Sequence, residues 1–343
     1  MTAPEASVVI PTRDRWDLLS TGSVPSALWQ EDVELEVVVV DDGSGDRTSE
    51  LLAALGDERV RVVRHDRPLG VARARNAGIW AARGAWIAFL DDDDLWSPRK
   101  LRRQIDAATL VGAEFAYGGA AAIADDRSWL YSLAPVDPET LASALLSQNV
   151  LWGGSSNVIV SADQVRSLGG FDERLFQICD WDLWIRLALS ARGVAVDEVL
   201  VGCVVHERSM LLVSEDDVFE ELAYLRTKHR DPSKELGVEL DRRTFTRWVA
   251  LGHRRAGRRF ASVATYLRGV VQDGDVANIV RAADALLGSK PAPHARPRSR
   301  SFRANRNWRF ASTAEPDWLA RYRSGDALNN AQATSKASSP VDL

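Results

Sequence analysis

Short apolar runs recur along the first ninety residues, and each is followed by polar or glycine-rich positions. The four runs are residues 6–10, 36–40, 60–64 and 86–90, all rich in valine, isoleucine or other apolar residues. The helical patterns that lie between them are residues 16–30, 48–55 and 71–83. Because β-branched runs alternate with helical segments at this spacing, the sequence predicts an α/β fold with a mostly parallel, Rossmann-like sheet and helices on both faces.

Polar loops follow three of the predicted strands. They are Pro11-Thr12, Asp41-Asp42-Gly43 and the run from Asp91 to Asp94. The carboxyl ends of parallel strands lie at one edge of a sheet, and ligands of such sheets bind in the crevice at that edge. The three loops are therefore predicted to converge on a binding site.

The acidic run Asp91-Asp92-Asp93-Asp94 is unusual after a buried strand, since adjacent carboxylates repel one another and are costly to bury without a partner. Oxygen ligands at a strand end suit a divalent cation such as Mg²⁺ or Mn²⁺. The alternative is a solvated acidic turn that precedes a helix near Pro98. The run alone leaves both interpretations open.

Further along, the pattern predicts a helix over residues 100–110, strands over 113–117 and 158–160, and a helix near residues 140–146. Another helix starts near Asp180 and places this carboxylate in its first turn. Residues 194–205 read as a strand pair or one bent strand. From about residue 215 four amphipathic helical patterns follow, at residues 216–230, 242–258, 261–271 and 276–287.

This change of character predicts three parts. Residues 1–213 form the α/β domain, residues 214–288 a helical C-terminal segment, and residues 289–343 a flexible tail with several arginines. The residues between Asp125 and Trp152 carry little readable signal.

Composition narrows the class of protein. The chain has 343 residues, of which 45% are apolar, and a formal net charge of only -5, so it is globular and its overall charge favours no polyanionic partner such as nucleic acid. Its two cysteines, Cys179 and Cys203, form no disulfide framework. The start resembles no secretion signal, and no apolar run approaches the ~18 residues of a membrane span. A cytoplasmic protein is expected, and peripheral contact with the inner face of a membrane is compatible with this.

Five motifs in this order resemble the family 2 glycosyltransferases of GT-A fold. They are residues 7–13 (SVVIPTR), 39–44 (VVDDGS), 70–78 (GVARARNAG), 89–94 (FLDDDD) and 169–186, which contains GGFDE and DWDLWIR. The resemblance spans roughly residues 6–206. The helical segment and the tail lie outside it.

The resemblance implies an inverting transfer of a sugar from a nucleotide diphosphate donor, such as a UDP-, GDP- or dTDP-sugar, to a hydroxyl group. The acceptor would be a glycan, a lipid-linked molecule or another glycoconjugate precursor, and a divalent metal, Mn²⁺ or Mg²⁺, would be the cofactor. The sequence identifies neither the sugar, the base, the acceptor nor the linkage.

The resemblance also assigns residues. Asp93 and Asp91 match the DxD positions that hold the metal, and Asp91 and Asp92 contact the donor. The other residues assigned to donor binding are Pro11, Thr12, Asp42 and Arg75. Asp180 matches the general base. Three further residues, Trp152, Trp181 and His206, are candidates for contact with the acceptor or the diphosphate.

The chain departs from the family at Cys179, where a glutamate usually precedes the base, so the hydrogen bonding of this loop is open. A nucleotidyltransferase is the main alternative, but residues 11–15 lack the glycine-rich loop that cradles a triphosphate. A non-catalytic sugar-nucleotide-binding protein is a second alternative, and it would not require both Asp93 and Asp180.

Overall fold

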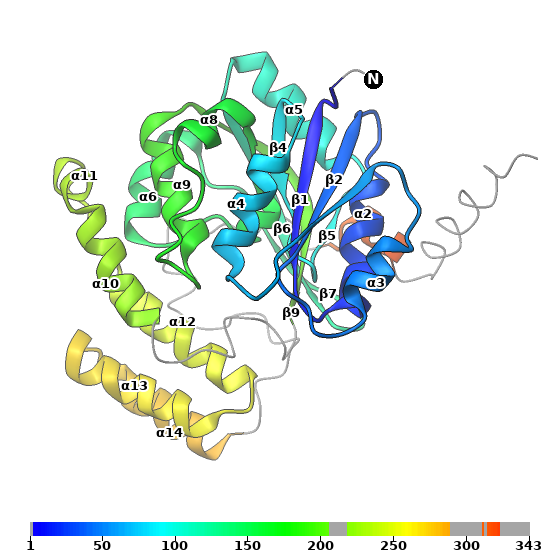
Figure 1. Ribbon diagram of the computed structural model, residues 1–343. Helices are drawn as coiled ribbons and strands as arrows, with labels where there is room; N and C mark the ends of the chain where they lie inside the picture. The colour runs from blue at the N-terminus through cyan, green and yellow to red at the C-terminus, as the bar shows by residue number, and fades with distance from the viewer. Residues whose placement is uncertain (1–2, 206–217, 289–310, 312–313, 323–343) are drawn as a thin grey trace, which may run out of the picture.

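The structure is a computed structural model that describes residues 3–205, 218–288, 311 and 314–322. Within these residues a nine-stranded sheet lies at the centre, with helices on both faces (Figure 1). The strands are β1 (Ala6–Thr12), β2 (Leu35–Asp41), β3 (Val60–Arg64), β4 (Trp86–Phe89), β5 (Leu95–Trp96), β6 (Phe115–Ala124), β7 (Trp129–Leu133), β8 (Ile159–Ser161) and β9 (Gly193–Val205).

Nine α-helices lie between the strands of the described residues, and a short π-helix, Leu19–Ser23, joins the first two of these helices. They are α1 (Trp16–Leu18), α2 (Val24–Leu28), α3 (Thr48–Ala53), α4 (Val71–Ala81), α5 (Lys100–Val111), α6 (Leu141–Ser147), α7 (Gly154–Asn157), α8 (Ala162–Ser167) and α9 (Cys179–Ser190). A 3₁₀ turn at Pro138–Thr140 precedes α6.

The strand order explains why the polar loops meet. It is β3-β2-β1-β4-β8-β6-β9-β5, with β7 paired to β6. The first four strands are parallel, and Thr12 pairs with Asp41 at the ends of β1 and β2. The loops that follow β1, β2 and β4 therefore lie at one edge. The predicted α/β class with helices on both faces is confirmed.

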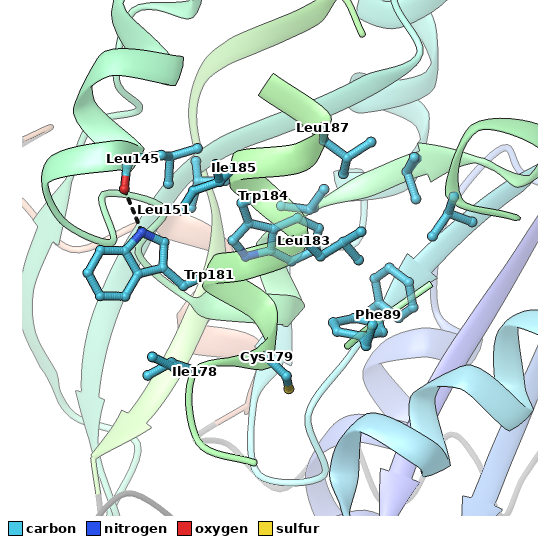
Figure 2. Close-up of a cluster of buried hydrophobic side chains, with 14 of the residues drawn as sticks. Phe89, Leu145, Leu151, Ile178, Cys179, Trp181, Leu183, Trp184, Ile185 and Leu187 are labelled. Atoms are coloured by element: carbon cyan, nitrogen blue, oxygen red, sulfur yellow. Dashed lines mark hydrogen bonds between the residues drawn. The ribbon is translucent and has the colours of Figure 1, made fainter. Parts of the chain in front are cut away.

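Residues that alternate along β2 supply both core layers. Val38 and Val40 belong to the cluster formed with α4, α6 and α9, whereas Val37 and Val39 pack with α2 and α5 on the other face. A strand buried on both faces must read as a continuous apolar run, which is why the sequence reveals it so clearly. Figure 2 shows the first layer, where Trp184 of α9 lies beside Phe89 of β4 with ring centroids 6.3 Å apart.

One strand differs from the prediction. β6 extends over Phe115–Ala124, beyond the predicted residues 113–117, although its second half consists of small residues. At Gly119 an added Cβ would lie 2.8 Å from the carbonyl oxygen of Leu133 and 3.0 Å from that of Glu198. Close approach of the neighbouring chains therefore requires the small residues that weaken the strand signal in the sequence. β9 is a single strand whose register against β6 shifts near Gly119.

Five helices follow β9 after the gap in the described residues. They are α10 (Val218–Lys228), α11 (Arg230–Glu235), α12 (Arg242–Arg255), α13 (Arg259–Asp273) and α14 (Ala277–Leu287). Val218, Leu222 and Leu225 of α10 join the core layer of α9, while α13 and α14 lie at the periphery (Figure 1). None of the helices in the described ranges is long and apolar enough to cross a membrane. The predicted limit between residues 213 and 214 falls outside the described residues.

Part of the predicted flexible tail is ordered. Asp317–Tyr322 forms a 3₁₀ helix whose Leu319 is buried against Leu95 and Ile123. The Tyr322 hydroxyl donates to the Trp96 carbonyl at 2.6 Å, and the Trp318 indole N–H donates to the Val199 carbonyl at 2.8 Å. The flexible-tail prediction therefore does not hold for these residues, because their apolar side chains cover the β5 edge of the sheet.

Lys100, at the start of α5, is buried without a counter-ion among the residues that the structure describes. Its side chain is fully shielded from solvent, and the ammonium group lies 4.0 Å from the centre of the Trp96 ring. Its Nζ has no hydrogen-bond partner among the described residues. Burial lowers the pKa of Lys100 well below its usual value, because the charged form loses its hydration.

Candidate active site

The four carboxylates of the acidic loop after β4 have different environments, and two of them point inward. Asp92 accepts a hydrogen bond from the Thr12 hydroxyl at 2.8 Å and another from Arg15 at 3.1 Å. Burial, with the nearby Asp93 charge, raises the pKa of Asp92 to about 7 although Arg15 opposes the shift. Asp94 accepts from the Ser156 hydroxyl at 2.6 Å and from the Val204 N–H at 3.1 Å. Asp94 therefore ties the loop to α7 and β9.

Asp91 and Asp93 are the more accessible pair. The Asp91 side chain is 32% exposed, and its Oδ1 accepts from Arg75 at 2.6 Å. Asp93 accepts from Arg15 at 3.2 Å through Oδ2. Within the described residues, no three acidic, histidine or cysteine side chains converge as a ready-made metal cage. Mg²⁺ sites beside phosphates commonly use only one or two carboxylates, so these two fit an ion that a diphosphate also ligates.

Arg75 connects the acidic loop with α9. Its guanidinium is buried, donates to Asp91 and to the Cys179 sulfur at 3.4 Å, and lies 5.3 Å from the centre of the Phe171 ring. The neighbouring carboxylates of Asp91 and Asp180 raise the pKa of Arg75 despite burial. The Nε–H of Arg75 has no partner among the described residues, which leaves one donor at the site unused.

Asp180 lies in the first turn of α9, as predicted. Its Oδ1 accepts from the Trp181 N–H at 2.7 Å, and its Oδ2 lies 2.9 Å from where a Cβ on Gly154 would stand. Burial raises the pKa of Asp180, while the Arg75 charge opposes the rise and the Asp91 charge adds to it. The structure thus brings Asp91, Arg75 and Asp180 into one electrostatic cluster, although they lie far apart in the sequence.

The predicted nucleoside side consists of Pro11, Thr12 and Asp42, and the structure also places these at the edge. Pro11 and Thr12 end β1, and the Asp42 N–H donates to the Thr12 carbonyl at 2.9 Å. The Asp42 carboxylate accepts from His65 at 2.7 Å and from the N–H of Gly70 at 2.8 Å. Asp42 therefore holds the loop before α4, and its contact with a base or ribose stays a prediction.

The three candidates for contact with the acceptor or the diphosphate differ in their surroundings. Trp181 is a core residue: its indole N–H donates to the Leu145 carbonyl at 2.6 Å (Figure 2). Its ring stacks near Phe245. Trp152 is partly exposed, with its ring 5.5 Å from that of Tyr131. His206 lies outside the described residues.

A family comparison agrees with this geometry. Residues 7–151 match the model of glycosyl transferase family 2. The chain carries a family 2 glycosyltransferase domain. In S. aureus TarS residues 1–349 in complex with UDP-GlcNAc, 82% of this chain aligns with 79% of that chain at a TM-score of 0.56. Since only 19% of the aligned residues are identical, this match establishes the GT-A fold alone.

The alignment with one named relative is longer than the match to the family model. The succinoglycan biosynthesis protein ExoO of Rhizobium meliloti is 35% identical over 219 residues, which cover 60% of this chain and 61% of that protein. The UDP-Glc:alpha-D-GlcNAc-diphosphoundecaprenol beta-1,3-glucosyltransferase WfgD of Escherichia coli is 34% identical over 112 residues, which cover 33% of this chain and 44% of that protein. The chain thus spans about three fifths of the length of ExoO.

Sequence reasoning about the glycosyltransferase domain missed Arg15 and the glycine pair at the start of α7. Arg15 supplies the cation beside Asp92 and Asp93, and its position shortly after a predicted strand end was a usable signal. Gly153 and Gly154 both have positive φ, at 88° and 47°, and Gly154 leaves the space next to Asp180. The Gly-Gly pair was visible in the sequence, but the proximity of Gly154 to Asp180 was not.

Glu221 of α10 fixes the loop in front of α9. Its carboxylate accepts from the N–H groups of Phe176 at 3.0 Å, Gln177 at 2.9 Å and Ile178 at 3.1 Å. The buried sulfur of Cys179 has its pKa raised to about 12, chiefly by burial, so it supplies no negative charge here. The helical segment therefore supplies a carboxylate to the loop that leads into α9.

Replacing Glu221 by glutamine is expected to cost about 1–3 kcal/mol of stability, because an amide group would face backbone donors that need an acceptor. We also expect a lower kcat, since Ile178 directly precedes α9 and its Asp180. Denaturant unfolding and turnover measure both effects. The exposed neighbour Glu220 is the matched control, and a Glu221→Gln protein as stable and active as Glu220→Gln would refute the assignment.

Proposed function

We propose that this protein is an inverting glycosyltransferase, which moves a sugar from a nucleotide diphosphate donor to an acceptor hydroxyl. The observation that carries the proposal is the cluster of Asp91, Arg75 and Asp180. It puts an anion-binding arginine between a pair of accessible carboxylates and a buried candidate base.

Different residues act on the acceptor hydroxyl and on the donor diphosphate. Asp180 takes the proton of the acceptor hydroxyl, and the burial that raises its pKa makes it a stronger base. Arg75 offers its guanidinium, which donates to Asp91, to a phosphate oxygen of the donor, because an arginine fork suits phosphate oxygens. Pro11, Thr12 and Asp42 line the nucleoside side.

Asp93 and Asp91 are the residues that would hold a divalent cation, Mn²⁺ or Mg²⁺. Such an ion neutralises charge that develops on the leaving diphosphate. In that state Arg15 and Arg75 exchange part of their bonding to these carboxylates for bonding to the phosphates, because both arginines already lie beside them.

The names of relatives support a narrower class of substrates. UDP and UDP-GlcNAc appear with TarS, so a UDP-sugar is the first donor to try, followed by GDP- and dTDP-sugars. ExoO is named for succinoglycan biosynthesis, and WfgD is named for transfer to alpha-D-GlcNAc-diphosphoundecaprenol. We propose polysaccharide or glycolipid synthesis, with the protein acting in the cytoplasm at the inner face of a membrane.

Replacing Asp93 by alanine is expected to weaken UDP binding in the presence of Mn²⁺ by about 10- to 100-fold, the range found for disturbed metal sites. Binding without metal should change much less. Calorimetry with UDP, GDP and dTDP, each with and without Mn²⁺, measures this and identifies the nucleotide. Asp66→Ala is the matched control, because Asp66 is an exposed carboxylate after β3 at the same edge. Undiminished Mn²⁺-dependent binding in the Asp93→Ala protein would contradict the metal assignment.

A further inference from the structure

The two peripheral helices α13 and α14 each expose an apolar stripe. On α13 the stripe contains Phe260, Leu267 and Val271, and on α14 and its first flanking residue it contains Val276, Val280 and Leu287. These six side chains are between 46% and 86% exposed. Their spacings of seven and four residues place each set on one helix face.

These stripes are faces that the bundle leaves uncovered. The opposite side of α13 buries Ser262, Tyr266 and Gly269, and that of α14 buries Asn278, Ala282 and Ala285. The stripes adjoin where the chain turns, since Val271 and Val276 flank the left-handed Gly274. Single exposed apolar residues are ordinary, but two aligned stripes on adjoining helices form a surface that gains by being covered. We call these six residues the α13–α14 surface.

The segment that carries this surface is strongly basic. Residues 242–288 contain nine arginines, three aspartates and neither lysine nor glutamate, a net charge of +6. The three aspartates are already in ion pairs with arginines of α12, as in Arg242–Asp273 at 2.7 Å. Residues 289–313, which follow α14 directly, add one lysine and six arginines and no acidic residue.

The charge is divided unevenly along the chain. Residues 242–288 carry +6, and since the whole chain carries -5, the remaining residues carry -11. The helices α12 to α14 are thus a basic part of an otherwise acidic protein, and an anionic plane attracts this part. Apolar residues beside arginines are also the arrangement by which helices lie in the boundary of a bilayer.

We propose that the α13–α14 surface docks the protein on an anionic phospholipid bilayer. A second copy of the chain is a poorer occupant, because it would bring two segments of +6 together. The basic residues 289–313 are poor for the same reason. A nucleic acid would match the charge but gains nothing from exposed valine and leucine side chains. The inference rests on the proposed function in one respect: docking would give the enzyme access to an acceptor that is held in a membrane.

Flotation of the full chain with vesicles tests the proposal. Vesicles of phosphatidylcholine with about one third phosphatidylglycerol should bind the protein at least tenfold more tightly than pure phosphatidylcholine, since each basic residue near an anionic surface contributes a factor of about five. Binding should weaken as salt is raised. Equal binding to both vesicles, or none to either, would overturn the proposal.

Two variants separate the apolar and the charged contributions. Val280→Asp combined with Leu287→Asp should lower binding at least tenfold, whereas Leu110→Asp should not change it. Leu110 is the matched control because it is 85% exposed near the C-terminal end of α5, against 86% for Leu287 near the end of α14. Arg259→Gln combined with Arg268→Gln should also weaken binding. If the aspartate pair binds like the wild type, or if it abolishes a dimer instead, the surface is no membrane site.

Vesicle binding needs neither donor nor acceptor. A wild-type protein that transfers sugar to a soluble acceptor but binds no anionic vesicles would refute the docking surface alone. Docking without any transfer would refute the proposed function alone.

Discussion

Replacing Asp180 by asparagine is expected to lower kcat by about 10²- to 10⁴-fold, the contribution that a positioned general base makes. The side chain keeps its shape and its Oδ1 can still accept from the Trp181 N–H, so the start of α9 stays intact. Binding of the nucleotide should therefore remain, because Asp180 lies across Arg75 from the carboxylates that face the diphosphate. Turnover and calorimetry on the same preparation test the two halves of this expectation.

The rival explanation for Asp180 is that it only favours the N-terminus of a helix. Asp163 is the matched control, since it is exposed and occupies the first turn of α8. Asp163→Asn should lose a few tenths of a kcal/mol of stability and no activity, as expected for a charge near a helix dipole. Full turnover in the Asp180→Asn protein would remove the base from the mechanism.

Replacing Lys100 by methionine is expected to stabilise the protein. Hydrophobic replacements of buried ionic groups of similar volume gain up to about 4 kcal/mol, and a cation–π contact with Trp96 offsets only part of the lost hydration of the ammonium group. Methionine has a similar length and no charge. The midpoint of urea unfolding should rise without a change in slope.

The stability difference between the wild type and the Lys100→Met protein should depend on pH. Because burial lowers the folded pKa of Lys100, the unfolded chain binds more protons between the folded value and about 10.4, the unperturbed one. Stability from this group therefore rises with pH across that window. The stabilisation by Lys100→Met should be largest at low pH and shrink as pH rises. Exposed Lys234→Met is the control, and a destabilised Lys100→Met protein, or a pH-independent difference, would contradict the account.

The fold was predictable where the physical requirement is local. The strands β1, β2 and β4 are buried on both faces, so most of their residues are apolar, and the buried Ser7 and Glu36 are hydrogen-bonded to each other. The polar residues that follow these strands meet at one edge of the sheet. The second half of β6 was not predictable in this way. Its small residues are selected by the close approach of the chains at Leu133 and Glu198, which no local pattern reveals.

The same limit applies to the candidate site. Asp91, Arg75 and Asp180 lie in motifs that resemble a known family, whereas Glu221 lies on α10, beyond the resemblance, and its partners are backbone N–H groups. Trp181 adjoins Asp180 in the sequence, but its side chain packs toward α6 and Phe245, an orientation that the sequence did not reveal.

Asp182, two residues after the candidate base, is fully buried in the middle of the glycosyltransferase domain. Its Oδ1 lies 2.8 Å from both the Lys228 ammonium and the His229 ring, and Arg186 donates to Oδ2 at 2.8 Å. With burial opposing them, these neighbours hold the pKa of Asp182 below its usual value. Two of its three partners thus lie at the end of α10. A unit that can be inherited or exchanged intact must extend at least to His229, well beyond the point at which the resemblance to the family ends.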